Sequence, residues 1–148
     1  MKFSAYHRRK RFKHWRDPPE ACDSCGERLV VLTGNEVVYK QPVGQWPWIY
    51  LCMSCGAYCG VHPHSVYPIG TLADRETRAL RSALHAMIDP LWKDGHMSRF
   101  KTYKMLSRMM GMPEGEEFHI GNLTRDECIR AGEVFKHWEM MADFNEPP

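Results

Sequence analysis

The sequence has no long hydrophobic run, since none of its apolar stretches approaches the roughly 18 residues that a transmembrane helix requires. We therefore expect no membrane-spanning segment. The first residues are charged and lack the apolar core of a secretory signal, so we also expect no export. The composition, 43% hydrophobic and 26% charged, excludes disorder throughout the chain. These absences favour a cytoplasmic location, where cysteines bind metal ions in preference to forming disulfides.

Acidic side chains are absent from residues 1–16, which hold seven of the 20 basic residues. The rest of the chain therefore has 13 basic residues and all 18 acidic residues. We assign a basic arm to residues 1–19, because Asp17-Pro18-Pro19 disfavours helix at its end. Cations interleaved with aromatic rings are typical of phosphate neutralisation and base stacking. The candidate contacts are Arg8, Arg9, Lys10, Arg11, Lys13, Trp15 and Arg16. A solvated tail, or docking on an acidic protein, is the alternative.

Four of the six cysteines form two Cys-x-x-Cys pairs, Cys22–Cys25 and Cys52–Cys55, and each pair is followed by glycine. Glycine allows the tight turn of a zinc knuckle, in which backbone N–H groups donate to the thiolates. Four thiolates at this spacing complete a tetrahedral Zn²⁺ shell and leave no position for a reacting water. We predict one structural Zn²⁺ in a ribbon over residues 20–61. Two disulfides, or unligated core cysteines, are the alternative.

Three strands are expected within this ribbon. Runs rich in β-forming residues at 29–32 and 36–39 flank Gly34-Asn35, which predicts a hairpin, and a third strand is expected at 48–51. The Trp46-Pro47-Trp48 sequence either covers a small core or forms an exposed aromatic platform. Cys59 is interpreted as a small buried side chain, although Cys59, His62 or His64 could instead replace a member of a Cys-x-x-Cys pair.

The hydrophobic period becomes helical after a proline-rich linker at residues 62–73, and three helices are predicted over residues 74–144. The first has Asp74 as its N-cap and ends near Asp89, and the second has Ser98 as its N-cap. The third begins at a capping box formed by Thr124 and Glu127. The predicted apolar positions of the last two helices are Phe100, Tyr103, Leu106 and Met110, then Cys128, Ile129, Phe135, Trp138 and Met141. The expected fold class is α+β, a zinc ribbon with a small antiparallel sheet followed by a three-helix module.

Basic residues recur at helical spacing in the first two of these helices, as Arg75, Arg78 and Arg81 and then as Lys101, Lys104 and Arg108. If the two faces adjoin, they form a basic strip opposite the core. Ordinary solvated faces paired with acids are the alternative.

Histidines are numerous, and a metal-dependent nuclease could be built from His85, Asp89, His96 and His119 if the helices converged. No pair among them matches a hydrolytic metal motif. Asp89 before proline is better explained as a helix stop, and His119 as a residue near a turn.

Four segments carry a family resemblance: residues 50–58 (YLCMSCGAY), 68–74 (PIGTLAD), 89–99 (DPLWKDGHMSR) and 119–122 (HIGN). On these segments the chain, from Cys22 to about Phe135, resembles a zinc-finger-containing family found mainly in bacteriophages and prophages. The resemblance implies a zinc site and a phage-like origin, but it supplies no catalytic residue and no substrate. The basic arm lies outside it, and Cys59 stands where an apolar residue is expected.

We therefore expect a phage-type accessory protein of the host cytoplasm that binds nucleic acid mainly through phosphate contacts and is not an enzyme. The alternative is a protein-interaction module that modulates a host machine, such as RNA polymerase, a ribosome or a nuclease complex. A metal-dependent nuclease is the second alternative. We expect neither a membrane nor a small-molecule substrate as a partner.

Overall fold

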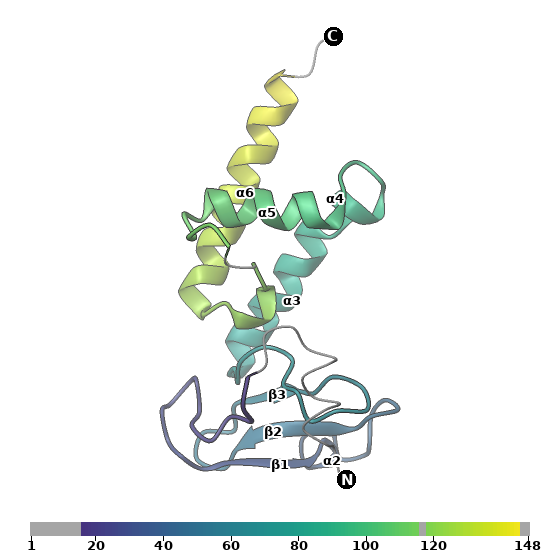
Figure 1. Cartoon of the computed structure of the whole chain (residues 1–148), viewed down its shortest axis with the longest axis vertical. Helices are drawn as coiled ribbons and strands as arrows, with labels where there is room; N and C mark the ends of the chain where they lie inside the picture. The colour runs from purple at the N-terminus through teal and green to yellow at the C-terminus, as the bar shows by residue number, and fades with distance from the viewer. Residues whose placement is uncertain (1–15, 116–117, 146–148) are drawn as a thin grey trace. The chain divides into compact units, whose positions relative to one another are not determined.

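The computed structural model describes residues 16–115 and 118–145, which fall into two compact units, one ending at Asp74 and the other beginning at Arg75. The first contains a three-stranded sheet and the second contains helices, so the α+β fold class is confirmed (Figure 1). Each unit encloses a hydrophobic core of its own. Among the described residues, no helix combines the length and apolar composition of a membrane span.

The sheet of the first unit is antiparallel, with strand order β1 (Val30–Gly34), β2 (Trp48–Cys52), β3 (Tyr58–Gly60). In its register Val30 lies opposite Cys52, and Tyr50 lies opposite Cys59. Because side chains alternate between the two faces of a strand, these four residues share one face. That face covers the core of the unit, which also includes Cys22, Ala57, Val61 and Leu72.

The predicted hairpin between residues 29–32 and 36–39 is wrong. Residues Glu36–Tyr39 form a short helix, α2, and the partner of β1 is β2. The buried side chain of Asn35 explains the difference, because its Nδ2 donates to the Val43 carbonyl (2.9 Å) and its Oδ1 accepts from the Val43 N–H (3.0 Å). This pair of hydrogen bonds, the Asn35–Val43 bracket, folds residues 35–43 into a compact connection. The β-forming residues of the segment are overridden by a contact eight residues away.

Residues 62–73, predicted as a linker, pack on the ribbon. Isolated β-bridges join Val61 to Pro68 and Tyr58 to Ala73. The Tyr50 hydroxyl donates to the Val66 carbonyl (2.6 Å), and the Trp46 indole N–H donates to the Ser65 carbonyl (2.9 Å). Strand β3, which is only three residues long, was not predicted.

The second unit contains α3 (Arg75–Ile88), α4 (Pro90–Lys93), α5 (Arg99–Met109), the 3-10 helix η1 (Ile120–Asn122) and α6 (Arg125–Asn145). The predicted caps of α5 and α6 are confirmed. Ser98 Oγ accepts from the Lys101 N–H (3.1 Å). At the start of α6, Thr124 Oγ1 accepts from the Glu127 N–H (3.2 Å) while Glu127 Oε1 accepts from the Thr124 N–H (3.0 Å). The two extra short elements, α4 and η1, were not predicted.

The core of this unit includes Leu84, Ile88, Leu106, Cys128 and Phe135. Three residues predicted to join it are exposed instead, namely Phe100, Ile129 and Met141. Each lies six positions from a central buried residue, Leu106 or Phe135, and is therefore displaced by about 120° around its helix. The apolar stripe is narrower than predicted.

The Asp89 side chain contacts three helices, namely the last turn of α3, the short helix α4, and α5. Its Oδ1 accepts from the Trp92 indole N–H (3.1 Å) and the Tyr103 hydroxyl (3.0 Å), and its Oδ2 lies 3.0 Å from His85 Nδ1. Burial disfavours the charged carboxylate, but hydrogen bonds from Trp92, His85 and Tyr103 outweigh it and lower the pKa of Asp89. Asp89 is thus more than the predicted helix stop.

We expect Asp89→Asn to lower the free energy of unfolding by about 1–2 kcal/mol at pH 7, because the charge-assisted hydrogen bonds are weakened. A carboxylate with a depressed pKa contributes stability above its unfolded-state pKa of about 3.9 and loses it as the pH falls through the folded-state pKa. The difference from the unsubstituted protein therefore shrinks below about pH 4. Urea unfolding followed by helical circular dichroism measures it. As control, the exposed Asp94→Asn shifts stability by less than about 0.5 kcal/mol. A pH-independent difference for Asp89→Asn contradicts the assignment.

Candidate metal centre

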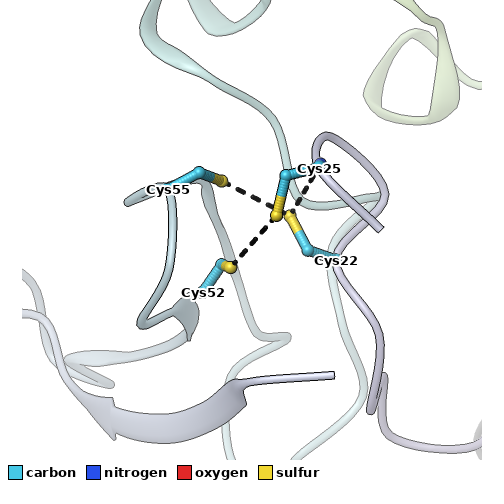
Figure 2. A group of neighbouring side chains, drawn as sticks. All are labelled: Cys22, Cys25, Cys52 and Cys55. Carbon is cyan, nitrogen blue, oxygen red and sulfur yellow. Dashed lines mark hydrogen bonds between the residues drawn. The ribbon is translucent and has the colours of Figure 1, made fainter. Parts of the chain in front are cut away.

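The four cysteines of the two Cys-x-x-Cys pairs converge in the first unit (Figure 2). Cys22 and Cys25 precede β1, whereas Cys52 is the last residue of β2 and Cys55 follows it. All four Sγ atoms lie within 4.8 Å of one another. The pairs Cys22–Cys55 and Cys25–Cys52 each have their sulfur atoms 3.7 Å apart.

Both knuckles have the same local backbone geometry. Gly26 and Gly56 each adopt φ +80°, a left-handed conformation that glycine enters without steric cost. Each glycine N–H donates to the carbonyl of the first cysteine of its pair, at 2.8 Å for Gly26 and 3.0 Å for Gly56. The turn leaves other N–H groups directed at sulfur, as when the Ser24 N–H donates to Cys22 Sγ (3.3 Å). The glycine after each pair is therefore what shapes the thiolate environment.

The geometry fits a single tetrahedral Zn²⁺. A Zn–S bond of about 2.3 Å implies sulfur atoms about 3.8 Å apart at the corners of a tetrahedron, which is close to the observed 3.7 Å. Cys22 and Cys52 are buried, while Cys25 and Cys55 are exposed, so the ion would lie between the core and the surface. Four soft thiolate donors suit Zn²⁺ and leave no coordination position for a substrate or water.

Comparison with known protein families agrees with this site. The model of a zinc-finger-containing domain matches residues 18–138, which include both knuckles and most of the helical unit. The chain belongs to this zinc-finger-containing family. A search of curated proteins and a search of solved structures each gave no significant match.

The thiols of this zinc-finger-containing domain have divergent acidities. Hydrogen bonding from the Cys55 N–H outweighs desolvation and, with a second bond from the Ser54 N–H, lowers the pKa of Cys52 to about 7. The Ala57 N–H lowers the pKa of Cys55, but desolvation and the three neighbouring sulfur atoms outweigh it and raise that pKa to about 12. A bound divalent cation favours all four thiolates, so metal binding releases protons and weakens as the pH falls.

Neighbouring residues that could have replaced a ligand lie outside the cluster. Cys59 is buried on β3 in the core of the first unit, as its interpretation as a small buried side chain predicted. The His62 ring packs against Tyr67 (5.6 Å between centroids), and the His64 ring packs against Trp46 (5.1 Å). Within residues 16–115 and 118–145, the cysteine quartet is the one group of three or more potential ligands close enough to share a metal ion. Of the four residues considered for a nuclease site, His85 and Asp89 contact each other, but His96 and His119 do not join them in a group that could share a metal ion.

The tryptophans of Trp46-Pro47-Trp48 are half-buried and pack against the core of the first unit. The structure therefore favours the covering role over the exposed platform. Cys128 is likewise packed in the helical core, where burial raises the pKa of its thiol.

The predicted basic contacts differ in their surroundings. Residues of the arm from Arg8 to Trp15 lie outside the described residues, whereas Arg16 donates to the Gly70 carbonyl. On α3, Arg75 is exposed, but Arg81 donates from Nε (3.0 Å) and Nη2 (2.8 Å) to the Leu123 carbonyl and therefore fixes the start of α6. Arg78 is half-buried and engaged in another interaction.

On α5, Lys101, Lys104 and Arg108 are all exposed. Among the described residues, the principal helix contacts join α3 to α6 and α4, and α5 to α4 and α6, but not α3 to α5. The predicted basic strip across α3 and α5 therefore stays a prediction, whereas the cations of α5 are at the surface.

Aromatic and basic residues that were not among the predicted contacts gather around α4. The Arg99 guanidinium lies over the Trp92 ring (5.3 Å) and the Tyr103 ring (5.5 Å), and Lys93 lies 5.5 Å from Trp92. Cations and aromatic residues alternate over residues 92–104, which is a signal in the sequence, but the helical period predicts Phe100 as a core residue. With that residue exposed, the segment becomes a mixed cationic and aromatic surface.

We expect a chelator to unfold the first unit of the zinc-loaded protein and leave the helical unit folded, because the metal ligands and the helical core lie in different units. The fluorescence of Trp46 and Trp48 should shift toward that of exposed indoles, while the helical circular dichroism persists. Retention of the ribbon structure with no bound metal contradicts the site.

A matched pair of cysteine substitutions tests the ligand set. Cys55→Ser removes an exposed predicted ligand and should weaken zinc binding by at least about tenfold, whereas Cys59→Ala changes a buried cysteine outside the quartet and should retain one zinc per chain. Zinc content by mass spectrometry under native conditions distinguishes the two variants. Equal losses in both would place Cys59 in the coordination shell.

Proposed function

We propose that this zinc-finger-containing protein binds nucleic acid, mainly through phosphate contacts made by the exposed face of α5. The observation that carries the proposal is the charge of this helix: residues 99–109 include four cations and no acid. Three of the cations, Lys101, Lys104 and Arg108, fall within about 60° of one another around the helix, opposite the buried Leu106. A single-sign, exposed face of this kind attracts a polyanion.

The charge of α5 is not a general property of the helical unit. Helix α6 carries five acids and three cations over residues 125–145. On α3, which has three arginines, Arg81 is engaged with a backbone carbonyl. The same helix also carries an acid, Glu76, which pairs with Arg125 at 2.7 Å. Among the described residues, no ion pair involves Lys101, Lys104 or Arg108. The cations of α5 are therefore available to an external anion.

The basic arm extends the same proposal. Its cations from Arg8 to Lys13 would make phosphate contacts of their own, and such contacts position a nucleic acid without selecting its sequence. The zinc-bound ribbon acts in this view as a rigid scaffold, because its filled thiolate shell offers no catalytic position. We accordingly propose binding without catalysis, in a protein of the phage-type origin that the sequence resemblance implies and of the cytoplasmic location that the paired Cys-x-x-Cys motifs favour.

Removing two α5 cations should weaken binding and flatten its dependence on salt. For Lys104→Ala with Arg108→Ala, the slope of log K against log salt concentration should decrease in magnitude by about 1.5, because each lost phosphate contact accounts for roughly 0.7–0.9. Fluorescence anisotropy with a labelled oligonucleotide over a range of salt concentrations measures the slope.

The matched control is Arg130→Ala with Lys136→Ala, which removes the same two residue types from exposed positions of the acidic helix α6. This variant should keep the original slope within error. Equal effects of the two double variants would assign the binding to overall charge and not to α5.

Docking of a partner protein is a second candidate, because the ribbon exposes apolar side chains around its edge strand β1. Leu29, Val31 and Met53 are all exposed, Met53 at 63%. An apolar surface beside an unpaired strand edge is suited to a protein. Copurification of a stoichiometric protein that survives nuclease treatment and is lost on Val31→Lys would favour this candidate over nucleic acid.

A further inference from the structure

Phe100 is the large hydrophobic residue of α5 that stands out at the surface, with 73% of its area exposed. It occupies the second position of the helix, between Arg99 and Lys101 in sequence. The Lys104 ammonium, one turn later, lies 5.7 Å from the centre of its ring. Around the helix axis Phe100 adjoins Lys104 and Arg108, so the ring belongs to the same exposed face as the cations.

An exposed phenyl ring among cations distinguishes between forms of nucleic acid. A duplex keeps its bases stacked on one another and offers mainly phosphates to such a face, so the ring gains little from it. An unpaired base can stack on the ring while neighbouring cations contact its phosphates. From this combination we propose that α5 binds single-stranded nucleic acid, with Phe100 as the stacking platform for an unpaired base. The inference rests on the proposed function and specifies its ligand.

The neighbouring cation Arg99 is held in place by the protein. Its guanidinium lies over both Trp92 and Tyr103, and the side chains of these two residues donate to the same carboxylate oxygen of Asp89. The planar group is therefore ordered before a ligand arrives, which reduces the entropy lost on binding. Arg99 fixes a positive charge next in sequence to the ring, whereas Lys104 and Arg108 extend the face by one further turn.

The composition of the face argues for a nucleic acid over a protein helix or strand. A protein groove requires several apolar contacts, and Phe100 is the one large hydrophobic residue of α5 that is mostly exposed. The other exposed side chains beside it are cations. Charge complementarity therefore selects a polyanion, and the single ring selects one with an accessible base. The helix is about 16 Å long, so the contact covers a few nucleotides.

The experiment compares the zinc-loaded full chain with two Phe100 variants on a single strand and a duplex. The probes are a fluorescein-labelled 20-nucleotide oligothymidylate and a mixed-sequence 20-base-pair DNA duplex. Phe100→Ala should weaken binding to the single strand by about tenfold and leave binding to the duplex unchanged, because one stacking contact is removed. Phe100→Trp should restore or strengthen single-strand binding. The salt slope should stay the same in both variants, since no charge is lost.

The control substitution is Met140→Ala, which removes a similarly exposed apolar side chain (61%) from α6 and should affect neither probe. Phe100 is exposed, so its loss should not alter the helical circular dichroism.

Equal affinities of Phe100→Ala and the unsubstituted protein for the single strand, or equal weakening toward both probes, would overturn the inference. If the unsubstituted protein binds neither probe, the proposed function itself fails. If it binds both probes, with a salt slope that depends on Lys104 and Arg108 but with a single-strand affinity that does not depend on Phe100, the function stands and the stacking platform does not.

Discussion

Mutual repulsion among four neighbouring thiolates is the constraint on which the first unit depends. Their sulfur atoms lie within 4.8 Å of one another, a spacing that is favourable only when a cation neutralises them. Two of the ligands, Cys22 and Cys52, are also members of the hydrophobic core. The metal site and the core therefore form one structure, which includes the ends of the first two strands. Zinc supplies here what additional buried apolar area supplies in a larger domain.

Short-range signals in the sequence predicted their part of the structure well. The knuckles and the caps at Ser98 and Thr124 depend on residues within about four positions of one another, and each has the expected geometry. The hairpin prediction failed because the Asn35–Val43 bracket and the pairing of β1 with β2 decide that region, and neither leaves a local pattern. The Asp89 hydrogen bonds similarly reach Tyr103 across 14 positions. Local chemistry was therefore predictable, whereas contacts between elements were not.

The candidate binding surface shows the same division. Periodicity alone identified the cations of α5, but it could not show that Arg81 is occupied by the Leu123 carbonyl or that Phe100 is exposed. Both facts depend on where the apolar stripe of each helix meets its neighbours. The candidate binding surface is consequently the exposed face of one helix, α5, and not a broad basic strip over two helices. The four-cysteine site remains the part of the molecule that sequence and structure assign in the same way.

The contact between Arg16 and the Gly70 carbonyl has a topological consequence. At this contact the first described residue of the unit meets a residue close to the end of the unit. The nearby Leu72 N–H donates to the carboxylate of Asp23 in the first knuckle (2.9 Å). The described part of the first unit therefore begins and ends at neighbouring points. Modules whose two ends lie together can be gained, lost or exchanged with little disturbance to the flanking chain. The described part of the metal-binding unit has this arrangement, with its first and last segments held together.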